Sequence, residues 1–359
     1  MLDDSLFDDP ARLVDTDAGG MLRSAAMAGA QVRSVGETVA EAGLEQLAGS
    51  RPRAVVLIAR PGVGRAVSGL LATVLGADCP VPVVVTDTAP TWVGPLDVVF
   101  GHTSDGYDPV LAEAVARATR RGASVVLAAP ADGPVAAAAA GRATVLPPKI
   151  PVPPELQFTH VYAAGLHVLA ALGLRDTDMG ELADELDHEA ERAHPDHEPL
   201  INPATSLALR LADRTPLLWG VDEVSEAVAR HGAFALACHA GVPSDVTSFA
   251  QATTRPALHQ AAASTGSATD IFADPEDSPG GLLRVFLVST RHDGRSDAAE
   301  REAVSALPAA DVVTPGESVR DDAVLRGGLL AARFDLASVY LGLASGTLGG
   351  PGWQALAMR

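Results

Sequence analysis

Short apolar runs alternate with helical patterns along most of the chain, and the clearest example lies between Leu96 and Pro130. There an apolar run, LDVVFG, is followed by a polar loop, by a helical pattern from Asp108 to about Arg121, and by a second apolar run, ASVVLAAP. Parallel strands need such a crossover helix, and they read as continuous apolar runs because both faces of their sheet are covered. The pattern therefore predicts an α/β fold with a doubly wound, flavodoxin-like parallel sheet.

The same alternation occurs twice, so the 359 residues suggest two domains. The strands expected in the first half are 54–59, 81–87, 96–101, 123–130 and 143–147, and the helices are 64–76, 108–121, 134–140 and 158–174. The strands expected in the second half are 215–220, 282–290 and 310–315, and the helices are 203–212, 222–240, 296–307 and 322–345. We expect an N-terminal helical segment over 1–50, a first domain over 51–175, a charged connector over 176–200 and a second domain over 201–359. The acidic stretch 270–281 is expected to be a solvated insertion.

Charge and cysteine content exclude several classes of function. The formal net charge of -19 disfavours nucleic acid and anionic membrane surfaces as partners. Cys79 and Cys238 are isolated in sequence and indicate a reducing compartment, without a disulfide or metal framework. The first residues carry no apolar signal segment, and no apolar run looks long enough and free enough of glycine and charge to span a bilayer. We therefore expect a cytoplasmic protein with no metal and no cofactor.

Two loops of the first half follow expected strands and are candidate ligand sites, because open parallel sheets bind ligands beyond the carboxyl ends of their strands. The first is RPGVGR, in which Gly62 and Gly64 allow a ligand to approach the backbone and Arg60 and Arg65 could pair with an anion. A Walker A loop is excluded, since no G-K-[ST] follows, and a plain tight turn is the alternative reading.

The second candidate loop runs from Gly101 to Asp108 and contains His102, Thr103, Ser104 and Asp105. Its hydroxyls and the following helix could form an oxyanion or sugar cradle. Asp108 followed by Pro109 also fits the structural role of a helix N-cap. Asp105 would repel a phosphate at that position.

The remaining histidines are weaker candidates. His188, His194 and His197 lie among acidic residues without the spacing of a known zinc motif, and a solvated connector is the simpler interpretation. His259 follows Pro256, which could begin a helix, and a surface or capping role competes there with a functional one.

Several segments resemble the SIS (sugar isomerase) family, and in particular the bifunctional phosphoglucose/phosphomannose isomerases. The segment 97–126, DVVFGHTSDGYDPVLAEAVARATRRGASVV, is similar to the SIS motif, whose loop reads S-x-S-G-x-T between strand and helix. Segments that resemble other parts of these isomerases, in the same order along the chain, are 19–32, 151–157, 201–220 and 333–346. The resemblance implies two SIS-type domains, a homodimer, and aldose–ketose isomerisation of a sugar phosphate.

The catalytic residues that the resemblance implies are largely missing. The family uses a glutamate base in an E-N-x-K motif, and matching Arg230 to the arginine before that motif places Ala237-Cys238-His239-Ala240 over it. The chain has no lysine after Lys149, although the family has one near its C-terminus. In the phosphate loop, Thr103 can stand for the first serine, whereas Asp105 and Asp108 replace the second serine and the threonine.

Two functions therefore remain open from the sequence. The first is a protein of this lineage that binds a carbohydrate derivative or a protein partner, with little or no isomerase activity. The second is an active sugar-phosphate isomerase with a rearranged site, in which His259 would match the family's histidine.

Overall fold

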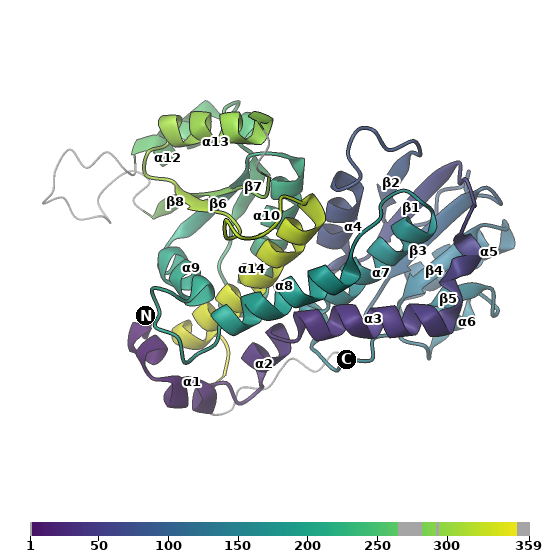
Figure 1. Cartoon of the computed structure of the whole chain (residues 1–359), viewed down its shortest axis with the longest axis horizontal. Helices are drawn as coiled ribbons and strands as arrows, with labels where there is room; N and C mark the ends of the chain where they lie inside the picture. Colours follow the sequence, from purple (N-terminus) through teal and green to yellow (C-terminus); the bar gives the residue numbers. More distant parts are fainter. Residues whose placement is uncertain (1, 265–281, 292–293, 350–359) are drawn as a thin grey trace, which may run out of the picture. The chain divides into compact units, whose positions relative to one another are not determined.

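The computed structural model describes residues 2–264, 282–291 and 294–349 and contains two parallel sheets, each with its own core (Figure 1). The described chain separates into one compact unit made of residues 27–187 and another made of the residues up to 26 and those from 188 onward. The two sheets confirm the α/β class and the parallel topology expected from the alternating pattern. The expected domain boundaries at 51–175 and 201–359 stay a prediction.

The unit formed by residues 27–187 contains a five-stranded parallel sheet in the order β2-β1-β3-β4-β5. Its strands are β1 (Ala54–Ala59), β2 (Val83–Thr86), β3 (Asp97–His102), β4 (Ser124–Ala128) and β5 (Ala143–Val145). Its helices are α3 (Ala28–Ala42), η2 (Leu44–Leu47), α4 (Gly64–Thr73), α5 (Pro109–Arg120), α6 (Pro134–Ala137), η3 (Pro154–Leu156), α7 (Phe158–Ala171) and most of α8 (Met179–Arg192).

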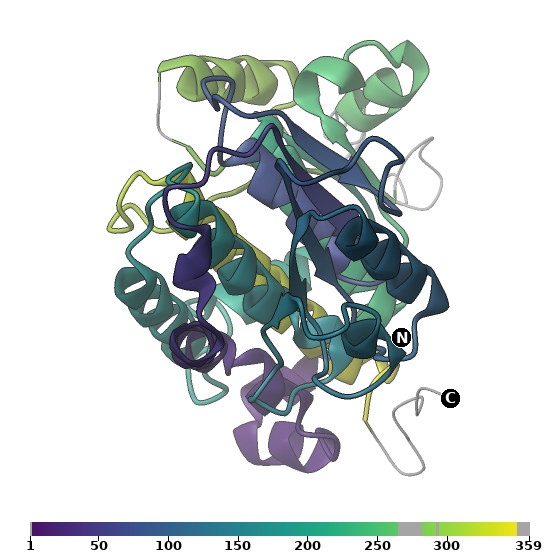
Figure 2. The same ribbon diagram turned by 90° about the vertical axis from the view of Figure 1, so that its right-hand side faces the viewer.

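Helices cover both faces of this sheet, as Figure 2 shows. On one face, Val56, Ile58, Val99 and Leu127 pack in a fully buried cluster with apolar residues of α5 and α6. The other face carries the alternate residues of the same strands, and α4 and α7 contact it. Close packing between those two helices depends on Gly165, where an added Cβ would lie 2.2 Å from a methyl group of Leu71.

The second unit contains a four-stranded parallel sheet in the order β7-β6-β8-β9. Its strands are β6 (Thr215–Gly220), β7 (Asp245–Ser248), β8 (Leu283–Val288) and β9 (Asp311–Val313). Its helices are η1 (Asp4–Asp8), α1 (Pro10–Thr16), α2 (Met21–Ala25), α9 (Pro203–Leu211), α10 (Glu223–Ala235), the π-helical turn η4 (Leu236–Ala240), α11 (Phe249–Ala252), α12 (Pro256–Ser264), α13 (Gly294–Ala306) and α14 (Ala323–Ser345).

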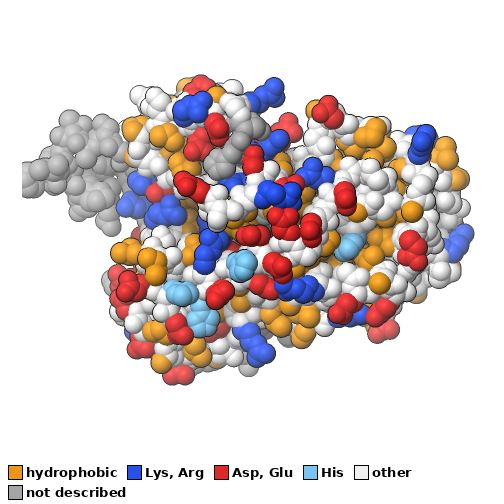
Figure 3. Space-filling view, in the orientation of Figure 1, with side chains coloured by type: hydrophobic (Ala, Val, Ile, Leu, Met, Phe, Trp, Pro, Cys, Tyr) orange, Lys and Arg blue, Asp and Glu red, His pale blue; other side chains and the backbone are white. Residues whose placement is uncertain are grey.

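Strand β7 and helix α11 were not expected from the sequence, because the short segment DVTSFAQA has no clear apolar period. The predicted acidic insertion at 270–281 lies outside the described residues. Acidic and basic side chains are interspersed on the face shown in Figure 3.

Helix α14 corrects one expectation from the sequence. Its 23 residues are long and apolar enough to cross a membrane by length and composition, although its glycines and its charges had argued against such a run. The whole apolar window is buried inside the protein, where α14 contacts α9 and α10. It is therefore a core helix of this unit.

Candidate ligand-binding site

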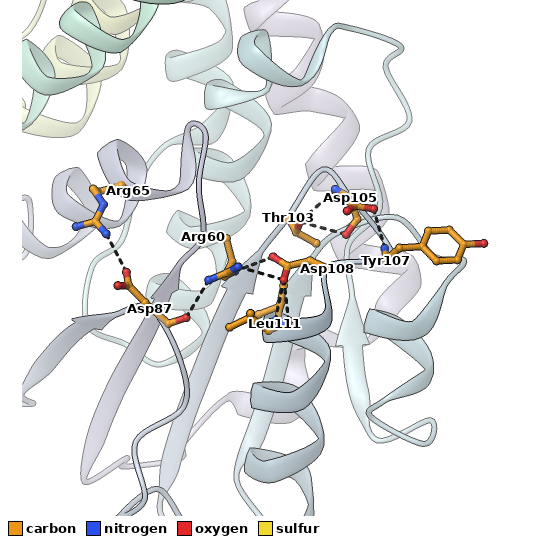
Figure 4. A network of polar contacts seen from close by, with 9 residues as sticks. Arg60, Arg65, Asp87, Thr103, Asp105, Tyr107, Asp108 and Leu111 are labelled. Atoms are coloured by element: carbon orange, nitrogen blue, oxygen red, sulfur yellow. Dashed lines mark hydrogen bonds and ion pairs between the residues drawn. The ribbon is translucent and has the colours of Figure 1, made fainter. Parts of the chain in front are cut away.

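The strands β1 and β3 lie next to each other at the point where the strand order of the first sheet reverses. They run in register from Ala54 opposite Asp97 to Ala59 opposite His102, so they end together. In a doubly wound sheet this switch point is the place where ligands bind, because the two following chain segments diverge to opposite faces. The structure thus brings both predicted loops, 60–65 and 102–108, to one edge of the sheet (Figure 4).

Arg60 and Asp108 form a two-point ion pair at this edge. Arg60 Nε lies 2.6 Å from Asp108 Oδ2 and Arg60 Nη2 lies 3.2 Å from Asp108 Oδ1, and both side chains are largely buried. Asp108 Oδ1 also accepts hydrogen bonds from the amides of Val110 and Leu111, so it caps α5. Burial favours the neutral carboxyl, but the hydrogen bonds from Arg60 and from these amides outweigh it and lower the pKa of Asp108. The Asp108 carboxylate therefore uses the donors that an anion would need at the start of α5.

Arg65 lies at the same edge of the sheet, and its side chain is exposed to solvent. Its Nη2 is 2.9 Å from Asp87 Oδ1, and both side chains are more than half exposed. Arg60 Nη1 approaches the backbone oxygen of Asp87 at 3.5 Å. An exposed pair of this kind contributes little to stability, so Arg65 can turn from Asp87 to a ligand at small cost.

The loop from Thr103 to Tyr107 is shaped by its own hydrogen bonds. Thr103 Oγ1 accepts from the amide of Asp105 at 3.1 Å, and Asp105 Oδ1 accepts from the amide of Tyr107 at 2.8 Å. Gly106 packs against the segment after β4, where an added Cβ would lie 2.6 Å from the backbone oxygen of Asp132. Ser104 is half-buried and Asp105 is exposed. A ligand would thus meet a preformed loop whose outer surface carries a carboxylate.

His102 is buried beneath the first loop. Its Nδ1 lies 2.8 Å from the backbone oxygen of Ala128, which can only accept, so Nδ1 carries the proton and Nε2 is an acceptor. Gly64 lies beside the ring, because an added Cβ there would be 3.4 Å from His102 Cδ2. Burial lowers the pKa of His102 to about 4, which leaves the imidazole neutral near pH 7.

Sequence reasoning missed a second buried imidazole, that of His160 in the first turn of α7. Burial and the neighbouring His102 lower its pKa to about 4, and a hydrogen bond with the backbone of Leu146 opposes them only in part. The signal that could have found it is a lone histidine in the otherwise apolar run FTHVYAAG.

The switch point of the second sheet lies between β6 and β8, and several of its polar groups bond to one another. Asp222 caps α10 by accepting from the amide of Ser225 at 2.8 Å, and the hydroxyls of Ser225 and Thr290 lie 3.0 Å apart. Gly220 brings β6 so close to α10 that an added Cβ would lie 2.2 Å from the amide nitrogen of Glu226. Here too a carboxylate of the chain itself caps the helix that follows a strand of the switch point.

The structure places His259 in the second unit, on α12. Its ring stacks on Trp219 with centroids 6.0 Å apart and planes at 10°, and Phe249 lies at 6.4 Å. His259 Nε2 is buried and has no hydrogen-bond partner among the described residues. This environment is that of a side chain packed at the edge of an apolar core.

The residues matched to the family's E-N-x-K motif form the π-helical turn Leu236–Ala240 at the end of α10. Cys238 is exposed there and His239 is buried. No side chain of this turn is a carboxylate, so it supplies no counterpart of the family's base. Within the described ranges, no three His, Cys, Asp or Glu side chains are grouped so that they could hold a metal ion.

Comparisons with known proteins agree on the fold. No protein-family model matches the sequence, and no curated protein matches it either. Among solved structures, tagatose-6-phosphate ketose/aldose isomerase from Escherichia coli is similar with a TM-score of 0.64 at 11% identity, over 97% of this chain and 98% of that one. A candidate phosphosugar isomerase from Clostridium difficile 630 also gives 0.64, at 9% identity, over 90% of this chain and 92% of that one.

The C-terminal domain of glucosamine-fructose-6-phosphate aminotransferase from Francisella tularensis gives a TM-score of 0.60 at 10% identity, over 92% of this chain and 98% of that one. Identities this low establish shared architecture alone. The chain thus has the SIS-type α/β fold, with two parallel sheets, that it shares with these solved structures.

Proposed function

We propose that this chain binds a carbohydrate derivative at the loops beyond β1 and β3 and has little or no aldose–ketose isomerase activity. The observation that carries the proposal is the position of Asp108, whose carboxylate caps α5 and pairs with Arg60. In the family that the chain resembles, this loop carries hydroxyls that receive a phosphate. Here an internal carboxylate takes the place of that anion.

The groups that face outward at this edge favour a ligand rich in hydroxyl or amino groups. Asp105 offers an exposed carboxylate, Ser104 a half-buried hydroxyl and Arg65 a guanidinium held only by an exposed partner. A phosphate beside Asp105 and Asp108 would meet like charges in a partly desolvated site, which is costly. Neutral or amino sugars avoid that repulsion.

A thermal-shift screen tests the proposal with four ligands: glucose, glucosamine, glucose 6-phosphate and fructose 6-phosphate. We expect the wild-type protein to be stabilised by a neutral or amino sugar and to respond weakly to both phosphates. The variant Asp105→Ser/Asp108→Thr should gain phosphate-dependent stabilisation, because the threonine hydroxyl can still cap the helix while Arg60 is released. The matched control is Asp78→Ser, which removes an exposed carboxylate from the loop between α4 and β2 and leaves Arg60, Arg65 and the α5 cap unchanged.

Two results would count against this proposal. One is a wild-type response to both phosphates that the double variant does not increase, which would place the phosphate elsewhere. The other is no response to any sugar in any variant, which would leave a protein–protein role.

The second candidate function is an active sugar-phosphate isomerase with a rearranged site. The similarity in fold to an E. coli isomerase over nearly the whole chain favours it. Turnover of glucose 6-phosphate, mannose 6-phosphate or fructose 6-phosphate that is lost in His259→Ala would support it. We further propose a homodimer in the cytoplasm, as the resemblance and the cysteine content imply.

A further inference from the structure

The second unit contains an apolar pocket that plays no part in the candidate site. Its volume is about 420 Å³, and the apolar part of its lining includes Val14, Leu22, Ala193, Leu336 and Tyr340. The Tyr340 hydroxyl donates to the backbone oxygen of Ala193 at 2.7 Å, so its polar atom is satisfied. Val14 is 62% exposed, which is unusual for a valine beside so much apolar surface.

The end of α14 directs the chain towards this pocket. Gly346 ends the helix with a φ of 73°, and the following turn is fixed because the Leu348 amide donates to the backbone oxygen of Gly342 at 3.0 Å. Thr347 Oγ1 donates to the backbone oxygen of His239 at 2.7 Å, and the Leu348 side chain is buried. These contacts hold the turn that follows α14 against the end of that helix and the turn η4.

Gly349 lies against the end of α1. A Cβ added there would be 2.2 Å from the backbone oxygen of Thr16 and 3.1 Å from a methyl group of Leu343. Thr16 stands between Val14 and Asp17, both of which line the pocket. Gly349, the last residue described before 350–359, thus lies close to two residues that line the pocket.

That segment, 350–359, reads GPGWQALAMR and contributes Trp353, Leu356 and Met358. The four residue-to-residue steps from Gly349 to Trp353 span at most about 14 Å. We propose that the segment docks on its own chain and that the Trp353 indole fills the pocket. Burial of such a side chain removes about 150–250 Å² from water. A tethered side chain also acts at a high effective concentration, which favours it over a free ligand.

Tryptophan fluorescence tests this docking in the full-length chain. The other tryptophans are Trp92, which is 42% exposed, and Trp219, which is fully buried. In a Trp92→Phe chain, we expect acrylamide to quench the remaining emission several-fold less than it quenches N-acetyltryptophanamide. Subtracting the Trp92→Phe/Trp353→Phe chain isolates the contribution of Trp353.

The pocket is then blocked with Val14→Glu/Ala190→Glu, two changes at positions that are exposed or half-buried, so the fold should survive them. We expect these changes to shift the Trp353 emission to the red and to make it accessible to acrylamide. The matched control is Val304→Glu, at another exposed valine on α13, which should change neither property. Circular dichroism checks that each variant is folded.

Three outcomes would overturn the proposal. The first is that acrylamide already quenches Trp353 freely in the Trp92→Phe chain, which would mean that another group occupies the pocket. The second is that Trp353 is protected from acrylamide and that Val14→Glu/Ala190→Glu does not change this protection, which would mean that Trp353 is buried elsewhere. The third is that Trp353 becomes protected only as the protein concentration rises, which would mean that the pocket binds the same segment of a second copy.

Discussion

The Arg60 guanidinium holds the Asp108 carboxylate through two hydrogen bonds, of 2.6 and 3.2 Å, at the point where α5 begins. The two residues are 48 positions apart in the chain, and their loops meet because β1 and β3 are neighbours in the sheet. The Asp108 carboxylate neutralises both the charge of Arg60 and the partial positive charge at the N-terminus of α5. We therefore expect it to stabilise this loop and, under the proposed function, to disfavour anionic ligands at the start of α5.

Replacing Asp108 by Ala should lower the free energy of unfolding by about 2–4 kcal/mol, because the helix loses its cap and Arg60 loses a largely buried partner. The pKa of Asp108 is lowered in the folded state, so its contribution is full above the unfolded pKa and is lost as the pH falls through the folded pKa. Urea denaturation should show a difference between wild type and variant at pH 7 that shrinks below about pH 4, the ordinary pKa of an aspartate. The exposed Asp87→Ala is the control and should cost less than about 1 kcal/mol; an equal loss in both variants would contradict the role of burial.

The buried imidazoles of His102 and His160 predict acid sensitivity. The pKa of His102 falls from 6.5 to about 4 on folding, so between these values the unfolded chain binds more protons and stability decreases as the pH decreases. The shift corresponds to roughly 3 kcal/mol over that pH range. Denaturation of His102→Gln across this range should show a shallower dependence on pH, whereas the exposed His194→Gln should match wild type. NMR titration should find the His102 ring neutral well below its ordinary pKa, and a ring that titrates near pH 6.5 would contradict its burial.

Gly106→Ala should be destabilising, because the new methyl group would lie 2.6 Å from the backbone oxygen of Asp132. We expect a loss of about 1–3 kcal/mol, typical of overpacking against a rigid neighbour. The matched substitution is Gly69→Ala on α4, where nothing lies within 4 Å and alanine favours the helix. Thermal denaturation should therefore move the two midpoints in opposite directions, and a rise for Gly106→Ala would show that the loop is not held as described.

Arg333 and Glu189 form a buried ion pair in the second unit, with Nε 2.5 Å from Oε1 and Nη2 3.1 Å from Oε2. The Arg333→Met variant leaves the fully buried Glu189 without its main partner, and chemical denaturation should show a loss of about 3–5 kcal/mol. Arg230→Met breaks an exposed pair with Glu226 and should cost about 1 kcal/mol or less. Arg192 also donates to Glu189 Oε2, so similar small losses in both variants would mean that this second arginine alone keeps Glu189 satisfied.

Much of the fold followed from the order of apolar runs. The predicted strand at 54–59 is confirmed residue for residue, and the helix predicted from Asp108 to about Arg121 extends from Pro109 to Arg120 with Asp108 as its N-cap. Buried parallel strands and their crossover helices leave this signal because both sheet faces exclude polar side chains. Strand β7 left no such signal, since most of its residues, Asp245–Ser248, are polar and only pairing with β6 makes them a strand.

The sequence by itself determined the α/β class, the positions of most elements and the two loops that could hold a ligand, because these depend on local periodicity and turn chemistry. Tertiary structure alone decided the strand order, which brings the two loops to one edge. It also decided that Arg60 pairs with Asp108 instead of facing solvent, and that His102 and His160 are buried as neutral rings. Those outcomes depend on which side chains, distant in sequence, are buried together in a low-dielectric environment. The spacing of residues along the sequence does not predict such contacts.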